Sequence, residues 1–194
     1  NLANYLGSVL SVSGTQAGVG RFQPAYFDTV VAPGCNTFTY AGSTAPVKAG
    51  QPFTVTVKAK RFGGDATDAT NTANYAGANA YLTTLSNAGV TTGLAGNTIA
   101  AASFTNGVGI SNVTYEVAIP QTAPLTLTMR ATDADPTSVS SSGHTEGAAV
   151  IRSGRLLLGN AHGSELLGLT VPLAIQHWEV GGYTTNTADN CTMI

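Results

Sequence analysis

The chain has 194 residues, of which 43% are hydrophobic and 9% are charged, and its net charge is −2. A chain of this length and apolar content can bury a core, which excludes an intrinsically disordered protein, and it has no basic surplus to attract nucleic acid. An ordinary soluble domain carries about 25% charged residues, so the surface here must depend on Thr, Ser, Asn and Gly, as it does on many secreted β-proteins.

The chain starts at Asn1 and shows no basic segment followed by an apolar stretch, so no signal peptide is expected. We therefore expect a processed protein or a piece of a longer one. Residues 1–18 are expected to form an N-terminal extension or strand, because Ser8–Ser13 has a strand-like composition. No apolar run is long enough to span a membrane.

Three segments alternate strictly between apolar and polar residues, which is the period of a strand with one buried face. They are Phe53–Lys60, Val113–Ile119 and Leu125–Thr132. One-sided strands must pack face to face. We therefore expect one shared core that contains Phe53, Val55, Val57, Val113, Tyr115, Val117, Leu125, Leu127 and Met129.

Shorter apolar runs separated by Gly-rich or Ser-rich breaks predict further strands. These lie at 37–40, 81–85, 101–105, 150–158, 166–175 and 178–185. Many short strands with turns at this spacing predict an all-β fold. We expect an immunoglobulin-like antiparallel β-sandwich over residues 19–135. A polar, flexible stretch at 133–147 would separate it from a C-terminal β section at 148–194, which would add long strands packed on the sandwich.

Two residues of the segment 159–164 could belong to a catalytic site. His162 and Ser164 could form a triad with a distant aspartate, but a nucleophile elbow requires Gly-x-Ser-x-Gly between a strand and a helix. A hairpin turn explains this segment better, so we expect that the protein is not an enzyme.

Three acidic residues near the polar stretch are candidate calcium ligands. Asp133, Asp135 and Glu146 offer the carboxylate oxygens that calcium prefers. The rest of an EF-hand loop is missing, so solvated turns remain the alternative. No other cofactor is expected.

The four residues Gln176, His177, Trp178 and Tyr183 form a candidate glycan site. An aromatic platform with neighbouring polar groups suits a sugar ring. Packing of the lone Trp178 in the core or in an interface is the alternative.

Two groups of segments resemble a known family. They are Val19–Phe27, Cys35–Tyr40 and Gly50–Phe53, and then Arg152–Leu167, Val171–Leu173, Gln176–Trp178 and Thr187–Thr192. Both resemble the uncharacterised domain of large bacterial surface proteins of the mannose-sensitive haemagglutinin (MSHA) pilus biogenesis protein Q type. The resemblance implies the outer surface of a Gram-negative bacterium and a link to type IV pili, with no catalytic residues to carry over.

These features together favour a non-enzymatic extracellular module that serves assembly, display or adhesion. Its partners would be other pilus or surface modules, with no nucleic acid among them. One alternative is a filament subunit joined to copies of itself by strand addition. The other is an adhesin domain that binds host or surface glycans.

Cys35 and Cys191 are the two cysteines of the chain. Thiols oxidise outside the cytoplasm, so we expect a disulfide that ties the C-terminal section to the first part. The alternatives are pairing of Cys191 with a cysteine elsewhere, and two reduced thiols.

Overall fold

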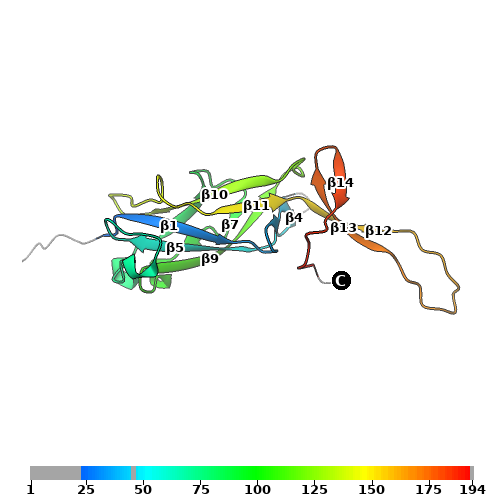
Figure 1. Cartoon of the computed structure of the whole chain (residues 1–194), viewed down its shortest axis with the longest axis horizontal. Coiled ribbons are helices and arrows are strands. Elements are labelled where there is room, and N and C mark those ends of the chain that lie inside the picture. The colour runs from blue at the N-terminus through cyan, green and yellow to red at the C-terminus, as the bar shows by residue number, and fades with distance from the viewer. Residues whose placement is uncertain (1–22, 45–46, 193–194) are drawn as a thin grey trace, which may run out of the picture.

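The computed structural model describes residues 23–44 and 47–192, so the strand expected within residues 1–18 lies outside the described residues. The described chain is all-β, as expected (Figure 1). Its helical elements are three short 3-10 helices: η1 (Asp68–Thr70), η2 (Gly77–Asn79) and η3 (Ala101–Ser103). The last of these occupies a segment for which the sequence had predicted a strand.

The strands form three sheets. The first has the order β1 (Tyr26–Ala32), β5 (Phe53–Lys60), β9 (Val108–Val117), β3 (Gly42–Thr44) and β4 (Val47–Lys48), with β7 (Leu94–Ala95) also on β9. The second has the order β2 (Thr39–Tyr40), β11 (Ala148–Arg152), β10 (Leu125–Asp133), β6 (Thr83–Asn87) and β8 (Thr98–Ile99). The third consists of β12 (Gly154–Leu158), β13 (Leu173–Glu179) and β14 (Gly182–Thr185).

The first two sheets are mixed, which corrects the expectation of a purely antiparallel arrangement. β2 pairs with β11 in parallel, and β3 pairs with β9 in parallel. Only Ala41 separates β2 from β3, although they belong to different sheets. The chain thus crosses from one sheet to the other without reversing, and it keeps its direction beside both neighbours.

One apolar core lies between these two sheets, which together we call the body. Its buried side chains come from the first sheet, such as Phe27 and Val55, and from the second, such as Leu85 and Ile151. The predicted core is confirmed for most of its members: Phe53, Val55, Val57, Val113, Leu127 and Met129 are buried in it, while Tyr115 and Leu125 pack against it partly buried. Val117 is buried but lies outside this cluster.

The edge strand β1 had no counterpart in the sequence prediction, because it does not alternate and it buries a carboxylate. Asp28 accepts a hydrogen bond from the backbone N–H of Thr145, and Thr29 accepts one from Gly147 N–H. These bonds fasten the polar stretch 134–147 along β1. The ring of His144 also stacks on Tyr26, 3.7 Å between centroids. The expected flexible separator is therefore part of the body.

The third sheet extends away from the body as a hairpin (Figure 1). Its strands are short, with five residues in β12, seven in β13 and four in β14, against ten in β9. The expected long C-terminal strands are therefore wrong. The expected strand at 166–175 is mostly loop, because β13 begins only at Leu173.

We predict that Leu127→Ala lowers the free energy of unfolding by about 3 kcal/mol, because the side chain is fully buried between the sheets and its removal leaves a cavity. Urea unfolding measures the change. Leu82→Ala is the matched control, since Leu82 is 48% exposed, and it should cost far less. Equal effects of the two substitutions would contradict the arrangement of the core.

Candidate functional site

The junction between the body and the third sheet is a nearly continuous strand. Only Ser153 separates β11 from β12. Its backbone carbonyl accepts a hydrogen bond from Trp178 N–H, and its hydroxyl accepts one from Gln121 N–H. The chain therefore passes directly from the second sheet into the third, and hydrogen bonds from Trp178 and Gln121 fix Ser153 between the two sheets.

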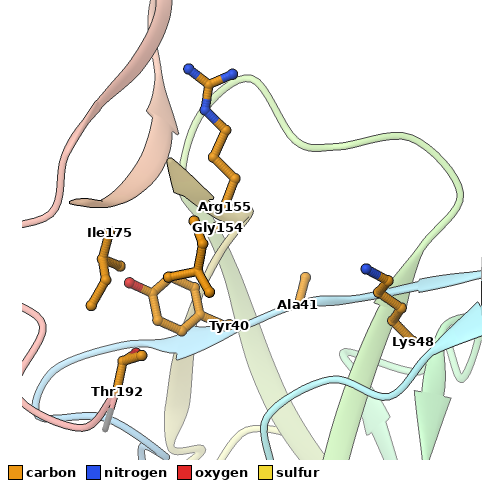
Figure 2. Close-up of a pocket in the computed structure, with 8 residues that line it drawn as sticks. Tyr40, Ala41, Lys48, Gly154, Arg155, Ile175 and Thr192 are labelled. Carbon is orange, nitrogen blue, oxygen red and sulfur yellow. The ribbon is translucent and has the colours of Figure 1, made fainter. Parts of the chain in front are cut away.

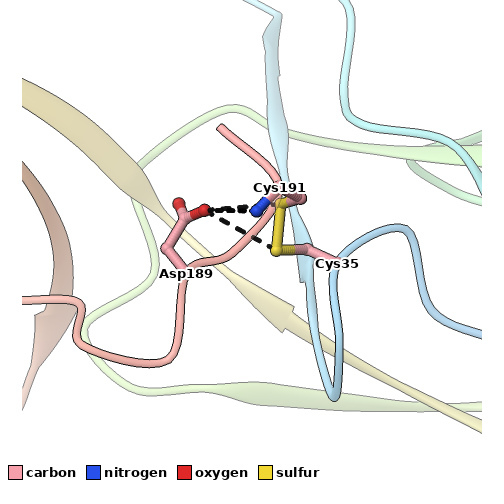
Figure 3. A group of neighbouring side chains, drawn as sticks. All are labelled: Cys35, Asp189 and Cys191. Atoms are coloured by element: carbon pink, nitrogen blue, oxygen red, sulfur yellow. Dashed lines mark hydrogen bonds between the residues drawn. A yellow bond between two sulfur atoms is a disulfide. The ribbon is translucent and has the colours of Figure 1, made fainter. Parts of the chain in front are cut away.

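A disulfide closes this junction a second time. Cys35, at the start of the body, is bonded to Cys191, with 5.4 Å between their Cα atoms and 156 positions between them in the sequence (Figure 3). The predicted bond is thereby confirmed. It supports an oxidising compartment, although weakly, because a disulfide does not identify the compartment.

Asp189 organises the polar groups around the disulfide. Its Oδ1 accepts hydrogen bonds from the backbone N–H groups of Cys191 and Thr192, at 3.0 and 2.9 Å. Its Oδ2 accepts bonds from the hydroxyls of Tyr40 and Thr192, at 2.7 and 2.8 Å. Burial by itself would raise the pKa of Asp189, but these donors together outweigh it and lower that pKa to about 2.

Tyr40 connects Asp189 and Asn186 of the C-terminal segment to strand β2 of the body. Its hydroxyl donates to Asp189 and accepts a hydrogen bond from Asn186 Nδ2. Burial, followed by the bond to Asp189, raises the pKa of Tyr40. Gln51 bridges as well, since its Nε2 lies 3.4 Å from Cys191 Sγ and donates to Gly34 O. We call this group the latch: Cys35, Tyr40 and Gln51 from the body, and Asn186, Asp189 and Cys191 from the C-terminal segment.

The latch also brings together three atoms of the kinds that bind metals. Among the described residues, Cys35, Asp189 and Cys191 place two sulfurs and a carboxylate oxygen within 4.8 Å of one another. The two sulfurs are bonded to each other, so neither is a thiolate able to bind a metal ion. In the oxidised protein this group is structural.

The predicted calcium ligands are each engaged by protein donors. Asp133 accepts hydrogen bonds from Tyr75 Oη and Val139 N–H, and Asp135 accepts bonds from Thr137. Glu146 forms a two-point ion pair with Arg130, at 2.7 and 3.1 Å. This pair, through its hydrogen bonds first, lowers the pKa of Glu146. Glu146 thus lies with Arg130 instead of completing a site with the two aspartates.

The predicted glycan residues divide between the two faces of the third sheet. Trp178 and Tyr183 are directly opposed on β13 and β14, and their rings form an edge contact with 4.6 Å between centroids. Gln176 shares this face and accepts a hydrogen bond from Arg155 Nε, while the Arg155 guanidinium lies 3.8 Å over the Tyr183 ring. His177 belongs to the other face, as strand alternation requires.

His177 is nearly fully buried, and its Nε2 lies 2.9 Å from Glu179 Oε1. This hydrogen bond lowers the pKa of Glu179. The four predicted residues are therefore neighbours in the fold, but only three of them line one surface. The fourth member of that surface is Arg155, which covers one side of the Tyr183 ring. The sequence analysis did not include Arg155 in this site.

A cavity of about 520 Å³ opens where the hairpin leaves the body (Figure 2). Tyr40, Lys48 and Thr192 line it from the body and the C-terminal segment, and Gly154, Leu156 and Ile175 line it from the third sheet. A side chain at Gly154 would overlap the Tyr40 ring, since a Cβ there would lie 2.5 Å from it. Glycine therefore allows the hairpin base to approach the latch closely.

Beyond this cavity the hairpin is strongly apolar and exposed. We call β12, the loop 159–172 and their exposed side chains the leucine hairpin. Its large apolar side chains are between 43 and 86% exposed: Leu156, Leu157, Leu158, Leu166, Leu167, Leu169 and Val171. Contiguous apolar patches larger than a few hundred Å² are rare on monomers and mark contact surfaces. This surface is the main feature that the sequence prediction missed.

The candidate catalytic residues lie in the loop of this hairpin. Ser164 Oγ accepts a hydrogen bond from Leu166 N–H, and Leu167 N–H donates to Ser164 O. Ser164 is thus engaged in a local turn, and His162 lies in the same extended loop between β12 and β13.

Comparison with known families divides the chain at the same junction. Residues 1–151 match the family model of the third domain of DUF6701, and residues 152–194 match that of its fourth domain. The chain belongs to the DUF6701 family. No curated protein and no solved structure matches it. In DUF6701 terms, the latch joins the third domain to the fourth, and the leucine hairpin belongs to the fourth.

Among the residues that the structure describes, no helix has the length and apolar content to cross a membrane.

We predict that replacing both cysteines, Cys35→Ser with Cys191→Ser, lowers the free energy of unfolding by up to about 5 kcal/mol. The bond closes a loop of 156 positions, and chain entropy alone gives a stabilisation of that size. Chemical unfolding with and without reductant measures it. A double variant as stable as the oxidised parent would contradict the prediction.

We also predict an acid-dependent loss of stability that depends on Asp189. Because the pKa of Asp189 in the folded protein, about 2, lies below its ordinary value of 3.8, the ionised carboxylate stabilises the fold above about pH 4, and this contribution disappears as the pH falls toward 2. Unfolding curves over this range should show a smaller acid loss in Asp189→Asn. Identical pH profiles for parent and variant would argue against it.

Proposed function

We propose that this DUF6701 segment is a non-enzymatic, extracellular module of a bacterial surface or pilus-associated protein, and that it serves assembly, display or adhesion. The observation that carries the proposal is the leucine hairpin, where seven large exposed apolar side chains gather in one short segment. Exposed apolar surfaces of this kind mark interaction sites, and the proposal assigns this one to contact with another protein. The resemblance to proteins of the MSHA pilus biogenesis type supports the outer surface of a Gram-negative bacterium as its location.

The body is best described as an immunoglobulin-like β-sandwich within this proposal. Its two facing sheets and shared core support this interpretation. The consecutive strands β2 and β3 also support it, because the chain switches from one sheet to the other between them. Sandwiches of this kind present loops and hairpins at their ends, where contacts with other modules form. The leucine hairpin leaves the body at such an end (Figure 1).

The latch supports a role in display, because it fixes the orientation of the leucine hairpin. A hairpin attached by one strand could rotate relative to the body, whereas this one is held by the nearly continuous β11–β12 strand on one side and by the disulfide and Asp189 on the other. A contact surface held in one orientation loses less conformational freedom when it binds.

A glycan-binding role is a second candidate, and the surface of Gln176, Trp178, Tyr183 and Arg155 favours it. These side chains combine two aromatic rings with a guanidinium and an amide. The indole Nε1 of Trp178 is a buried donor without a hydrogen-bond partner. Binding of a glycan array that is lost in Trp178→Ala would support this candidate over the first.

We predict that Leu166→Ser with Leu167→Ser reduces assembly at the surface of cells that make the full-length protein, because the change removes apolar groups from the proposed contact surface. The fold should be retained, since these side chains are 86 and 75% exposed. Antibody against the body, applied to intact cells, measures display, and adhesion is scored in parallel. Val180→Ser is the matched control, since Val180 is 93% exposed in the β13–β14 turn.

The proposal fails if antibody reaches the protein only after the cells are opened. It also fails if the double serine variant is displayed and adheres as well as the parent does.

A further inference from the structure

The outer side of β12 is an open strand edge. β12 is the last strand of the third sheet, with β13 on one side and no strand of the described chain on the other. The flanking residues Ser153 and Gly159 bond to the chain of β13, because Trp178 N–H donates to Ser153 O and Gly159 N–H donates to the carbonyl of Pro172, the residue before β13. In an antiparallel pair such bonding alternates along the strand. The backbone groups of Leu156 and Leu158 therefore point outward.

This edge lacks the protection that natural edge strands usually carry. Lysine, proline, bulges and inward charges normally prevent an edge from pairing with another chain. Residues 154–158 read Gly-Arg-Leu-Leu-Leu, and all five are exposed. Three of the five are leucine, and the single charge, Arg155, is occupied with Gln176 and Tyr183.

From this edge we propose that β12 pairs antiparallel with β12 of a second copy of this chain, about a two-fold axis at Leu157. The inference rests on the proposed function, because it names the protein that the leucine hairpin contacts. The two three-stranded sheets then join into one sheet that runs through both copies. Each body lies at an opposite end of the shared strand pair.

The register follows from the chemistry of the edge. An axis at Leu157 places Leu156 opposite Leu158 of the second copy, and these are the residues whose backbone groups are free to pair. It also places Leu157 opposite its own counterpart, so that leucine meets leucine three times. An axis at Arg155 would oppose two like charges, which destabilises a strand pair. The Leu157 register matches apolar groups and separates the two arginines.

The exposed apolar area suits an interface between copies. Seven large side chains that are each nearly half or more exposed amount to several hundred Å² on each copy. A standard protein interface buries about 800 Å² on each partner. In a two-fold contact each copy contributes the same patch, so one self-complementary apolar patch can form both sides of the interface. The low charge of the hairpin gives no complementary field that would select a different, charged partner.

Disulfide trapping tests this register. In the proposed pair, position 157 faces itself across a non-hydrogen-bonded site with about 4.5 Å between Cα atoms, within the reach of a disulfide. Position 155 lies on the same face of the strand, but its two copies are about 13 Å apart, beyond that reach. Both positions are exposed, and the native cysteines are already bonded to each other.

We expect Leu157→Cys to form about tenfold more covalent dimer than Arg155→Cys under mild oxidation at equal concentration, since only the first lies within disulfide range. Non-reducing gels and mass spectrometry of the 194-residue chain measure it. Equal trapping at the two positions indicates random collision and overturns the proposal. No trapping at position 157 also overturns it.

Analytical ultracentrifugation provides a second measurement that needs no new cysteine. The parent chain should be a dimer, and Leu156→Glu with Leu158→Glu should be a monomer with an unchanged circular dichroism spectrum. A monomeric parent overturns the second copy as partner. If the Leu166 and Leu167 variant still loses surface assembly in that case, the proposed function stands and the partner is a different protein.

Discussion

The disulfide between Cys35 and Cys191 is the constraint on which the arrangement of this chain depends. A 43-residue stretch that folds as one hairpin and one short strand cannot bury a core of its own. Its position is therefore set by attachment at both ends, by the β11–β12 strand and by the bond to Cys35. Asp189, held ionised by four donors, fixes the geometry around that bond.

The latch and the leucine hairpin have opposite characters, and the contrast is informative. Close to the body, the third sheet is tied down by specific polar contacts and by Gly154 against Tyr40. Farther out, the same sheet presents leucines on both faces and an open edge. A module that needed only solubility would not keep this surface. The orientation of the surface is controlled, while its apolar groups remain uncovered in the described chain.

Strict alternation in β5 and β10 was sufficient to predict the strands and most of the core, because each buries one face. Alternation failed at β1, where Asp28 is buried and accepts a hydrogen bond from Thr145 N–H, and it did not reveal that the three leucines of the predicted strand at β12 are exposed. The cysteine pair was predictable from compartment chemistry. The latch was not, since nothing local links Tyr40 to Asp189, 149 positions away.

The closed loop also determines how the chain would respond to tension. Tension applied before Cys35 and after Cys191 would pass through the sulfur–sulfur bond, so the residues between the two cysteines would bear no stretching force, whereas β1, which precedes Cys35, lies outside the closed loop. At roughly 3.3 Å per extended residue, about 500 Å of polypeptide would be withheld from unravelling. The strands from β2 to β14, with the leucine hairpin among them, would therefore stay within one covalently closed loop even if β1 were pulled away.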